Sequence, residues 1–305
     1  PGATNCVTPV RDAMADSIPM VLICGQVARA SIGTDAFQEA PIYNIMSACA
    51  KHVFLVSDET KLEATIRTAF AIARSGRPGP VVIDLPKDVQ NHEAQFVGEG
   101  ALELRGYDKR IQELLTARMT EKEANAFFAL LSKAKRPLIY AGGGVISANA
   151  ASELRAFSKQ FQIPVVTTLM GIGSVDTTDD LSMRMLGMHG MAYANYAVDD
   201  CDFLFAVGAR FDDRVAGKVS EFAPNAKIAH VDIDAAEIGK IKGVDWSHVG
   251  DAKMALADLM AAGKKFKRDF APWIKHLTKL KKDHPLNHKR DADIIQPQEV
   301  LETLN

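Results

Sequence analysis

Short apolar runs alternate with segments of helical periodicity in the first third of the chain. The run Pro19–Val27 predicts a buried strand, and Val81–Leu85 predicts a second. Ala3–Ser17 and Glu59–Arg74 carry apolar residues at helical spacing and predict helices. Buried strands that are separated by helices are typical of a parallel sheet covered on both faces, so this pattern predicts an α/β fold.

The alternation of apolar runs and helical segments stops near residue 91 and resumes near residue 121. This predicts a linker over 96–120 and a second α/β domain over 121–265. Helices are expected at Glu121–Lys133 and Ser147–Gln160. Strands are expected at Pro137–Ala141, Pro164–Leu169, Phe203–Val207 and Lys227–Ile233. Residues 1–95 then form the first domain, and 266–305 form a helical segment that follows the second.

The segment Lys264–Arg290 holds ten Lys or Arg residues and two acidic residues, with apolar residues at helical spacing. It predicts an amphipathic helix with a solvated basic face; nucleic-acid binding is the alternative. The formal net charge of the whole chain is −2, which argues against a nucleic-acid partner. No apolar run approaches the roughly 20 residues that span a bilayer.

Four cysteines, at positions 6, 24, 49 and 201, are too scattered for a disulfide framework or a zinc site. This usage favours a reducing, cytoplasmic setting.

Four clusters follow predicted strands or turns in the second domain. They are the glycines Gly142, Gly143 and Gly144, the loop Leu186–Gly190, the segment Gly208–Arg214, and the acids Asp232, Asp234 and Glu237. Glycines allow backbone to approach a phosphate, arginines pair with it, and acids accept from ribose hydroxyls. Each cluster alone also fits a plain turn or a surface ion pair, but together they predict a dinucleotide site. No acid–base role is expected for His189.

The first domain offers two further candidates, Gly33–Glu39 and Pro86–Asp88. Phe37 and Gln38 could line a pocket with an apolar ring and an amide. Lys87 could attract a carboxylate, although spacing alone favours a solvated lysine at a helix start.

Several of these segments resemble the acetolactate synthase family (acetohydroxyacid synthases), catalytic subunits within the thiamine-diphosphate enzymes. The Pro1–Asn5 and Ser75–Pro80 segments recur across thiamine-diphosphate enzymes. More specific to the synthases are Gly33–Glu39, Gly187–Gly190 and Gly208–Arg214. The resemblance also includes Gly25–Val27, Pro86–Asp88, Ala141–Gly144 and His230–Asp234, and covers essentially the whole chain. Ala28 departs from the proline that many members have after Gly-Gln-Val, which bears on inhibitor sensitivity.

The resemblance implies a fold of three α/β domains, of which this chain would hold the second half of the pyrimidine-binding domain and the whole central, Rossmann-like, FAD-binding domain. The activating glutamate would lie upstream of Pro1, and the motif for Mg²⁺ and the diphosphate downstream of Asn305. We therefore expect the chain to be part of a longer protein, with most ligands of thiamine diphosphate and Mg²⁺ elsewhere and no metal ligands here.

The implied reaction decarboxylates pyruvate and joins the remaining two-carbon unit to pyruvate or 2-ketobutyrate, in branched-chain amino acid biosynthesis. Phe37, Gln38 and Lys87 match the family's active-site residues, and FAD would be bound without a redox role. The implied FAD contacts are Arg77, Gly142, Gly143, Gly144, Thr168, Leu169, Met170, Leu186, Gly187, Met188, His189, Gly208, Arg210, Asp212, Arg214, Asp232, Ile233, Asp234, Glu237, Gly250 and Asp251. The resemblance implies two kinds of partner: further copies of the catalytic subunit, in a dimer or tetramer, and a small regulatory subunit.

Three other functions stay open from the residues alone. The first is another thiamine-diphosphate carboligase or decarboxylase, the second a flavin or nicotinamide oxidoreductase, and the third a non-catalytic flavin-binding module.

Overall fold

A computed structural model describes residues 1–288, 290 and 293–304. The chain divides into two compact units. The first comprises Pro1–Met119, Val231–Ile238 and His248–Ala255, and the second Thr120–His230, Gly239–Ser247 and Leu256–Asn305. The expected parallel α/β architecture is confirmed in the sheets described below.

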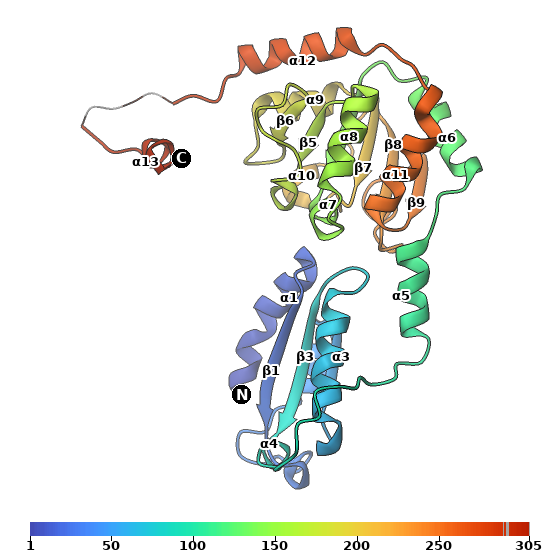
Figure 1. Cartoon of the computed structure of the whole chain (residues 1–305). Coiled ribbons are helices and arrows are strands. Elements are labelled where there is room, and N and C mark those ends of the chain that lie inside the picture. The colour runs from blue at the N-terminus through green and yellow to red at the C-terminus, as the bar shows by residue number, and fades with distance from the viewer. Residues whose placement is uncertain (289, 291–292, 305) are drawn as a thin grey trace. The chain divides into compact units, whose positions relative to one another are not determined.

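The first unit contains a three-stranded parallel sheet of order β1-β3-β2, formed by β1 (Met20–Gln26), β2 (His52–Leu55) and β3 (Pro80–Pro86). Successive side chains of a strand point to opposite faces. Accordingly, Val81 and Ile83 pack in one buried cluster with α3 (Leu62–Arg74), whereas Val82 packs in another with α1 (Val7–Asp16) and α2 (Ile42–Ser47). Figure 1 shows α1 and α3 on either side of β1 and β3.

Short helices complete this unit: η1 (Gly2–Cys6), η2 (Arg29–Ser31), η3 (Glu59–Lys61), α4 (Lys87–Gln90) and α5 (Tyr107–Thr116). The strands expected at Pro19–Val27 and Val81–Leu85 are confirmed, as are the helices at Ala3–Ser17 and Glu59–Arg74, apart from an initial 3₁₀ turn in each. The expected linker is not wholly irregular, because α5 forms within it and Tyr107 packs against the α3 cluster.

The second sheet has six strands in the order β6-β5-β4-β7-β8-β9, and the pairs β4–β5, β4–β7 and β5–β6 are parallel. The strands are β4 (Pro137–Ala141), β5 (Val165–Thr167), β6 (Ser182–Met185), β7 (Phe203–Val207), β8 (Lys227–Asp232) and β9 (Trp246–Val249). The four expected strands are therefore confirmed, with β5 shorter than expected.

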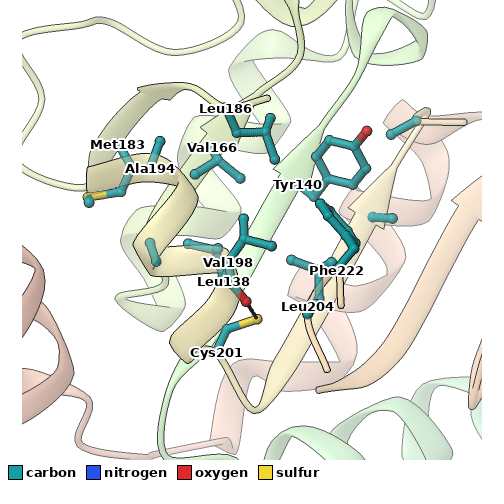
Figure 2. Close-up of a cluster of buried hydrophobic side chains, with 14 of the residues drawn as sticks. Leu138, Tyr140, Val166, Met183, Leu186, Ala194, Val198, Cys201, Leu204 and Phe222 are labelled. Atoms are coloured by element: carbon teal, nitrogen blue, oxygen red, sulfur yellow. Dashed lines mark hydrogen bonds between the residues drawn. The ribbon is translucent and has the colours of Figure 1, made fainter. Parts of the chain in front are cut away.

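The central strand β7 is buried along its whole length. Leu204 and Ala206 join the cluster that Figure 2 shows with Leu138, Tyr140 and Phe222. On the opposite face, Phe205 packs edge-on against Phe127, with ring centroids 4.9 Å apart. Because β7 packs against buried side chains on both of its faces, every residue of the strand must be apolar.

The helices of this part of the chain are α6 (Glu121–Leu131), α7 (Gly143–Ser147), α8 (Ala151–Phe161), η4 (Leu169–Gly171), α9 (Ala192–Asp200), α10 (Asp213–Ala216), α11 (Ala252–Ala262), η5 (Gly263–Lys265), α12 (Ala271–Asp283) and α13 (Pro297–Leu304). The start of α6 is fixed by a capping box, in which Thr120 accepts from the Glu123 amide and the Glu123 carboxylate accepts from the Thr120 amide. The helices expected at Glu121–Lys133 and Ser147–Gln160 correspond to α6 and α8.

The basic tail forms a shorter helix than the expected Lys264–Arg290. α12 begins after Asp269, whose carboxylate accepts from the Ala271 amide, and it buries Trp273 and Leu277 in the same cluster as Leu138 and Leu204. The Trp273 indole also donates to the Pro137 carbonyl over 2.9 Å. The apolar face of this helix is thus part of the core. Lys289, Asp291, Ala292 and Asn305, which belong to the expected helical segment, lie outside the described residues. None of the described helices combines the length and apolarity of a membrane span.

Candidate functional site

Three glycines bring two strand-end turns into direct contact in the second unit. A Cβ on Gly142 would lie 2.1 Å from the Gly208 carbonyl oxygen, and one on Gly144 would lie 2.6 Å from the Gly208 Cα. Gly208 itself has φ +56°. Because the atoms in the way are backbone, they cannot rotate aside, and only glycine fits at these positions.

The amides of two of these glycines are used within the protein. Gly142 donates to the Val207 carbonyl over 2.9 Å, and Gly144 donates to the Gly208 carbonyl over 3.0 Å. The sequence predicts that these glycines face a pyrophosphate. In the structure the amides of Gly142 and Gly144 join the turn after β4 to the turn after β7, so any contact of these two residues with a cofactor would use other atoms and stays a prediction. Gly143 begins α7, where the first amides have no acceptor within the helix.

The loop after β7 presents its charged residues on either side of a buried ring. Phe211 has φ +57° and is almost fully buried, with its ring 5.3 Å from that of Tyr140 and 5.4 Å from that of His230. Arg210 and Asp212 flank it, remain partly exposed and lie 3.6 Å apart. Asp212 also caps α10 by accepting from the Arg214 amide. Burial of Phe211 therefore fixes where Arg210 and Asp212 emerge.

Two further loops place apolar side chains in solvent near strand ends. After β5, the Thr168 hydroxyl accepts from the Gly171 amide, and Leu169 and Met170 are 69% and 41% exposed. After β6, Met188 is 64% exposed and donates through its amide to the Arg214 carbonyl over 3.0 Å. That bond joins the Leu186–Gly190 loop to the loop after β7.

Within this loop, Gly187 has φ +98° and exchanges two hydrogen bonds with the Asn195 side chain, and His189 is exposed. Leu186 is buried in the core. The structure thus brings the glycine, arginine and methionine candidates of the second unit to one set of connected loops.

The Arg77 guanidinium of the first unit has an acceptor for each of its five N–H groups. The acceptors are the Ser17 hydroxyl, the carbonyls of Met14 and Ala15, and the carboxylates of Asp234 and Glu237. This arrangement attaches the turn after β8 to the end of α1. The expected flavin contact of Arg77 stays a prediction, since its donors are occupied by protein atoms here.

The remaining acidic candidates have local structural partners. Asp232 is buried and accepts from the Asp234 amide, and its carbonyl accepts from the Gly250 amide. Asp251 accepts from the Lys253 and Met254 amides at the start of α11. Ile233 lies between the two aspartates. These carboxylates shape the turns that they occupy.

The candidates of the first domain lie at the carboxyl edge of two paired strands. Gln26 ends β1 opposite Pro86, which ends β3, and Lys87 follows at once. Arg29 ties the two strand ends together, because its backbone amide and Nε both donate to the Asp88 carboxylate, over 2.9 and 2.6 Å. This hydrogen bonding lowers the pKa of Asp88. Phe37 and Gln38 lie on the loop after β1, and Phe37 is 90% exposed.

Lys87 is the cation at this edge with no ion pair among the described residues, since Asp88 is bound by Arg29. Among the described residues, no group of three or more His, Cys, Asp or Glu side chains is placed to hold a metal ion. The edge therefore offers an exposed ammonium, an amide and an aromatic ring.

Two family models match the chain. Residues 1–48 match the N-terminal TPP binding domain of thiamine pyrophosphate enzymes, and residues 124–259 match the central domain of the same enzymes. Together these segments cover more than half of the chain. The chain belongs to the thiamine pyrophosphate enzymes.

Within this family, the chain is similar over its full length to acetolactate synthases. It is 46% identical to acetolactate synthase 1 of Nicotiana tabacum, with 100% of this chain and 45% of that protein aligned. It is 47% identical to the acetolactate synthase large subunit of Corynebacterium glutamicum, with 100% and 48% aligned. The resemblance inferred from the motifs is confirmed. The chain spans about half the length of the curated relatives that it matches.

Sequence reasoning missed several residues that shape the candidate site. Arg29 was not singled out. It follows the predicted strand Pro19–Val27, and Asp88 follows the predicted strand Val81–Leu85, so the ends of two parallel strands could have suggested the pair. Glu39 was included only as the last residue of the Gly33–Glu39 motif. The buried Phe211 was passed over in favour of its charged neighbours, and its positive φ has no signature in the sequence.

Proposed function

We propose that the chain is the pyrimidine-side and central part of an acetolactate synthase catalytic subunit. The reaction is the thiamine-diphosphate-dependent decarboxylation of pyruvate and its carboligation to a second 2-ketoacid, giving 2-acetolactate or 2-aceto-2-hydroxybutyrate. The observation that carries this proposal is the similarity of the whole chain to curated acetolactate synthases. The test is product analysis of the full-length protein with pyruvate, thiamine diphosphate and Mg²⁺.

In this proposal the carboxyl edge of the β1–β3 pair receives the 2-ketoacid. Lys87 binds the carboxylate by a charge-assisted hydrogen bond, which is stronger than a neutral one. Gln38 orients the ketone through its amide, and Phe37 excludes water from the reacting carbon. Thiamine diphosphate supplies the electron sink for decarboxylation when bound.

The second unit would hold FAD. The group needs an apolar surface for its ring system and cations for its phosphates, and the described residues fit both needs. Leu169, Met170 and Met188 are exposed apolar side chains on the strand-end loops. Arg210 is partly exposed on the loop after β7, to which the Met188 amide is hydrogen-bonded through the Arg214 carbonyl. Gly143 allows close approach of backbone at the turn after β4. A structural rather than redox role for FAD follows the family resemblance.

Replacing Arg210 by Ala should weaken FAD binding by roughly 10- to 100-fold, the effect of losing charge-assisted hydrogen bonds to a phosphate. Flavin fluorescence titration measures the change. Arg268→Ala is the matched control, because Arg268 is an exposed arginine of the same unit outside the strand-end loops. Arg155 would be a poor control, since it donates to the Ser174 carbonyl. Equal FAD affinity in the two variants would remove Arg210 from the site.

Further parts of the proposal follow the family resemblance. They are Mg²⁺ as the partner of the diphosphate, 2-ketobutyrate as an alternative acceptor, a homo-oligomeric enzyme and a small regulatory subunit, the last in keeping with relatives that are named large subunits. A cytoplasmic location rests on the scattered cysteines alone, because several plant relatives are named chloroplastic.

A further inference from the structure

The loop that carries Phe37 and Gln38 has an unusual backbone. Gly33, Asp35 and Gln38 all have positive φ angles, of +83°, +58° and +66°. Residues other than glycine rarely adopt such angles, and they persist only where the surrounding structure holds them in place. Some interaction must therefore fix this seven-residue loop.

The carboxylate of Glu39 supplies that interaction. One oxygen accepts from the Gly33 amide, and the other accepts from the Ala36 amide over 3.1 Å. The Glu39 amide in turn donates to the Ala36 carbonyl over 2.9 Å. Hydrogen bonding from the Gly33 amide lowers the pKa of Glu39, with smaller contributions from neighbouring amides of the loop. The charged carboxylate thus closes the loop on itself.

The end of the loop is attached separately to the sheet. The Gln26 side chain donates to the Ala40 carbonyl over 2.9 Å and to the buried Asp84 carboxylate over 3.2 Å. Gln26 and Asp84 lie on the paired strands β1 and β3. Phe37 and Gln38 lie between the Glu39-bonded turn and this attachment. A phenylalanine that is almost fully exposed is therefore held by a loop that is bonded at both ends.

We propose that Glu39 is a positioning residue, whose carboxylate closes the loop 33–39 and so presents Phe37 and Gln38 to the 2-ketoacid. This inference rests on the proposed function. Glu39 need not touch the substrate, because both of its oxygens are used by the loop. A glutamine could not replace it fully, since the side-chain NH₂ would face a backbone N–H.

The test compares Glu39→Gln with Glu63→Gln in the full-length protein. Glu63 is a matched control, because its carboxylate also accepts from two backbone amides, those of Val97 and Gly98, on another segment of the same unit. In Glu39→Gln, hydrogen exchange of the amides of residues 33–36 should accelerate roughly tenfold, as expected for losing one hydrogen bond to a charged acceptor. Exchange in β3 should be unchanged.

The same variant should lower kcat/KM for acetolactate formation by roughly 10- to 100-fold, mainly through a higher KM for pyruvate, with FAD affinity unchanged. Glu63→Gln should leave loop exchange and kinetics at wild-type values. Wild-type loop exchange in Glu39→Gln would overturn the proposal, as would faster exchange with wild-type kinetics. If the wild-type protein makes no acetolactate, the proposed function is wrong and the positioning role with it, whereas exchange still reports whether Glu39 closes the loop.

Discussion

Replacing Gly142 by Ala is expected to destabilise the second unit by about 3 kcal/mol, at the upper end of the usual cost of overpacking. The new Cβ would lie 2.1 Å from the Gly208 carbonyl oxygen. That oxygen also accepts from the Gly144 amide, so moving it breaks the hydrogen bonding between two turns. Gly142 has φ −104°, which any residue adopts, so the cost comes from the contact and not from the backbone angle.

Tryptophan fluorescence during urea unfolding measures this effect selectively, because both tryptophans of the chain, Trp246 and Trp273, are buried in the second unit. Gly243→Ala is the matched control. It lies in the same unit with open space around its Cβ position and without a positive φ, so its stability should change by less than about 1 kcal/mol. An unchanged unfolding midpoint in Gly142→Ala would show that the two turns can separate without cost.

Replacing Lys87 by Ala should lower kcat/KM for pyruvate by roughly 10- to 100-fold in the full-length protein. The reason is the loss of one charge-assisted hydrogen bond to a carboxylate, which contributes about 1.5–3 kcal/mol. The ammonium is exposed beside an aspartate that Arg29 already neutralises, so it is available to a substrate anion. Steady-state kinetics of acetolactate formation gives the measurement.

Lys109→Ala is the control for this variant, because Lys109 is an 83% exposed lysine of the same unit with one weak contact, 3.9 Å from Glu113. Lys51 would be unsuitable: its ammonium donates to the carbonyls of Ile72 and Ser75 at the end of α3, and burial lowers its pKa to about 8. Equal kinetics in Lys87→Ala and Lys109→Ala would make Lys87 an ordinary surface lysine.

The strands that the sequence predicts most accurately are those with uninterrupted apolar runs. Pro137–Ala141 and Phe203–Val207 match β4 and β7 in both bounds, because residues buried on both faces leave a continuous pattern. β2 and β6 are four residues long and partly exposed, so neither leaves such a pattern. α5 was missed because it is largely polar and buries no residue.

The sequence indicated the candidate site by segments and not by individual contacts. The strand-end clusters and family motifs lie on loops that follow strands in the structure, and their role in binding stays a prediction. They could not show that Gly142 and Gly144 use their amides within the protein, because that depends on the turn after β7, more than 60 residues along the chain. Likewise, the five acceptors of Arg77 come from segments far apart in sequence, and no local pattern predicts their meeting.

Product analysis of the full-length protein distinguishes an acetolactate synthase from a decarboxylase of the same enzyme family. Pyruvate is supplied with thiamine diphosphate, Mg²⁺ and FAD, and CO₂, 2-acetolactate and acetaldehyde are measured together. We expect one 2-acetolactate for each CO₂ released, because a second pyruvate bound at the carboxyl edge of the β1–β3 pair accepts the two-carbon unit that decarboxylation leaves. Release of CO₂ with acetaldehyde and no 2-acetolactate would contradict it and identify a decarboxylase of the same enzyme family instead.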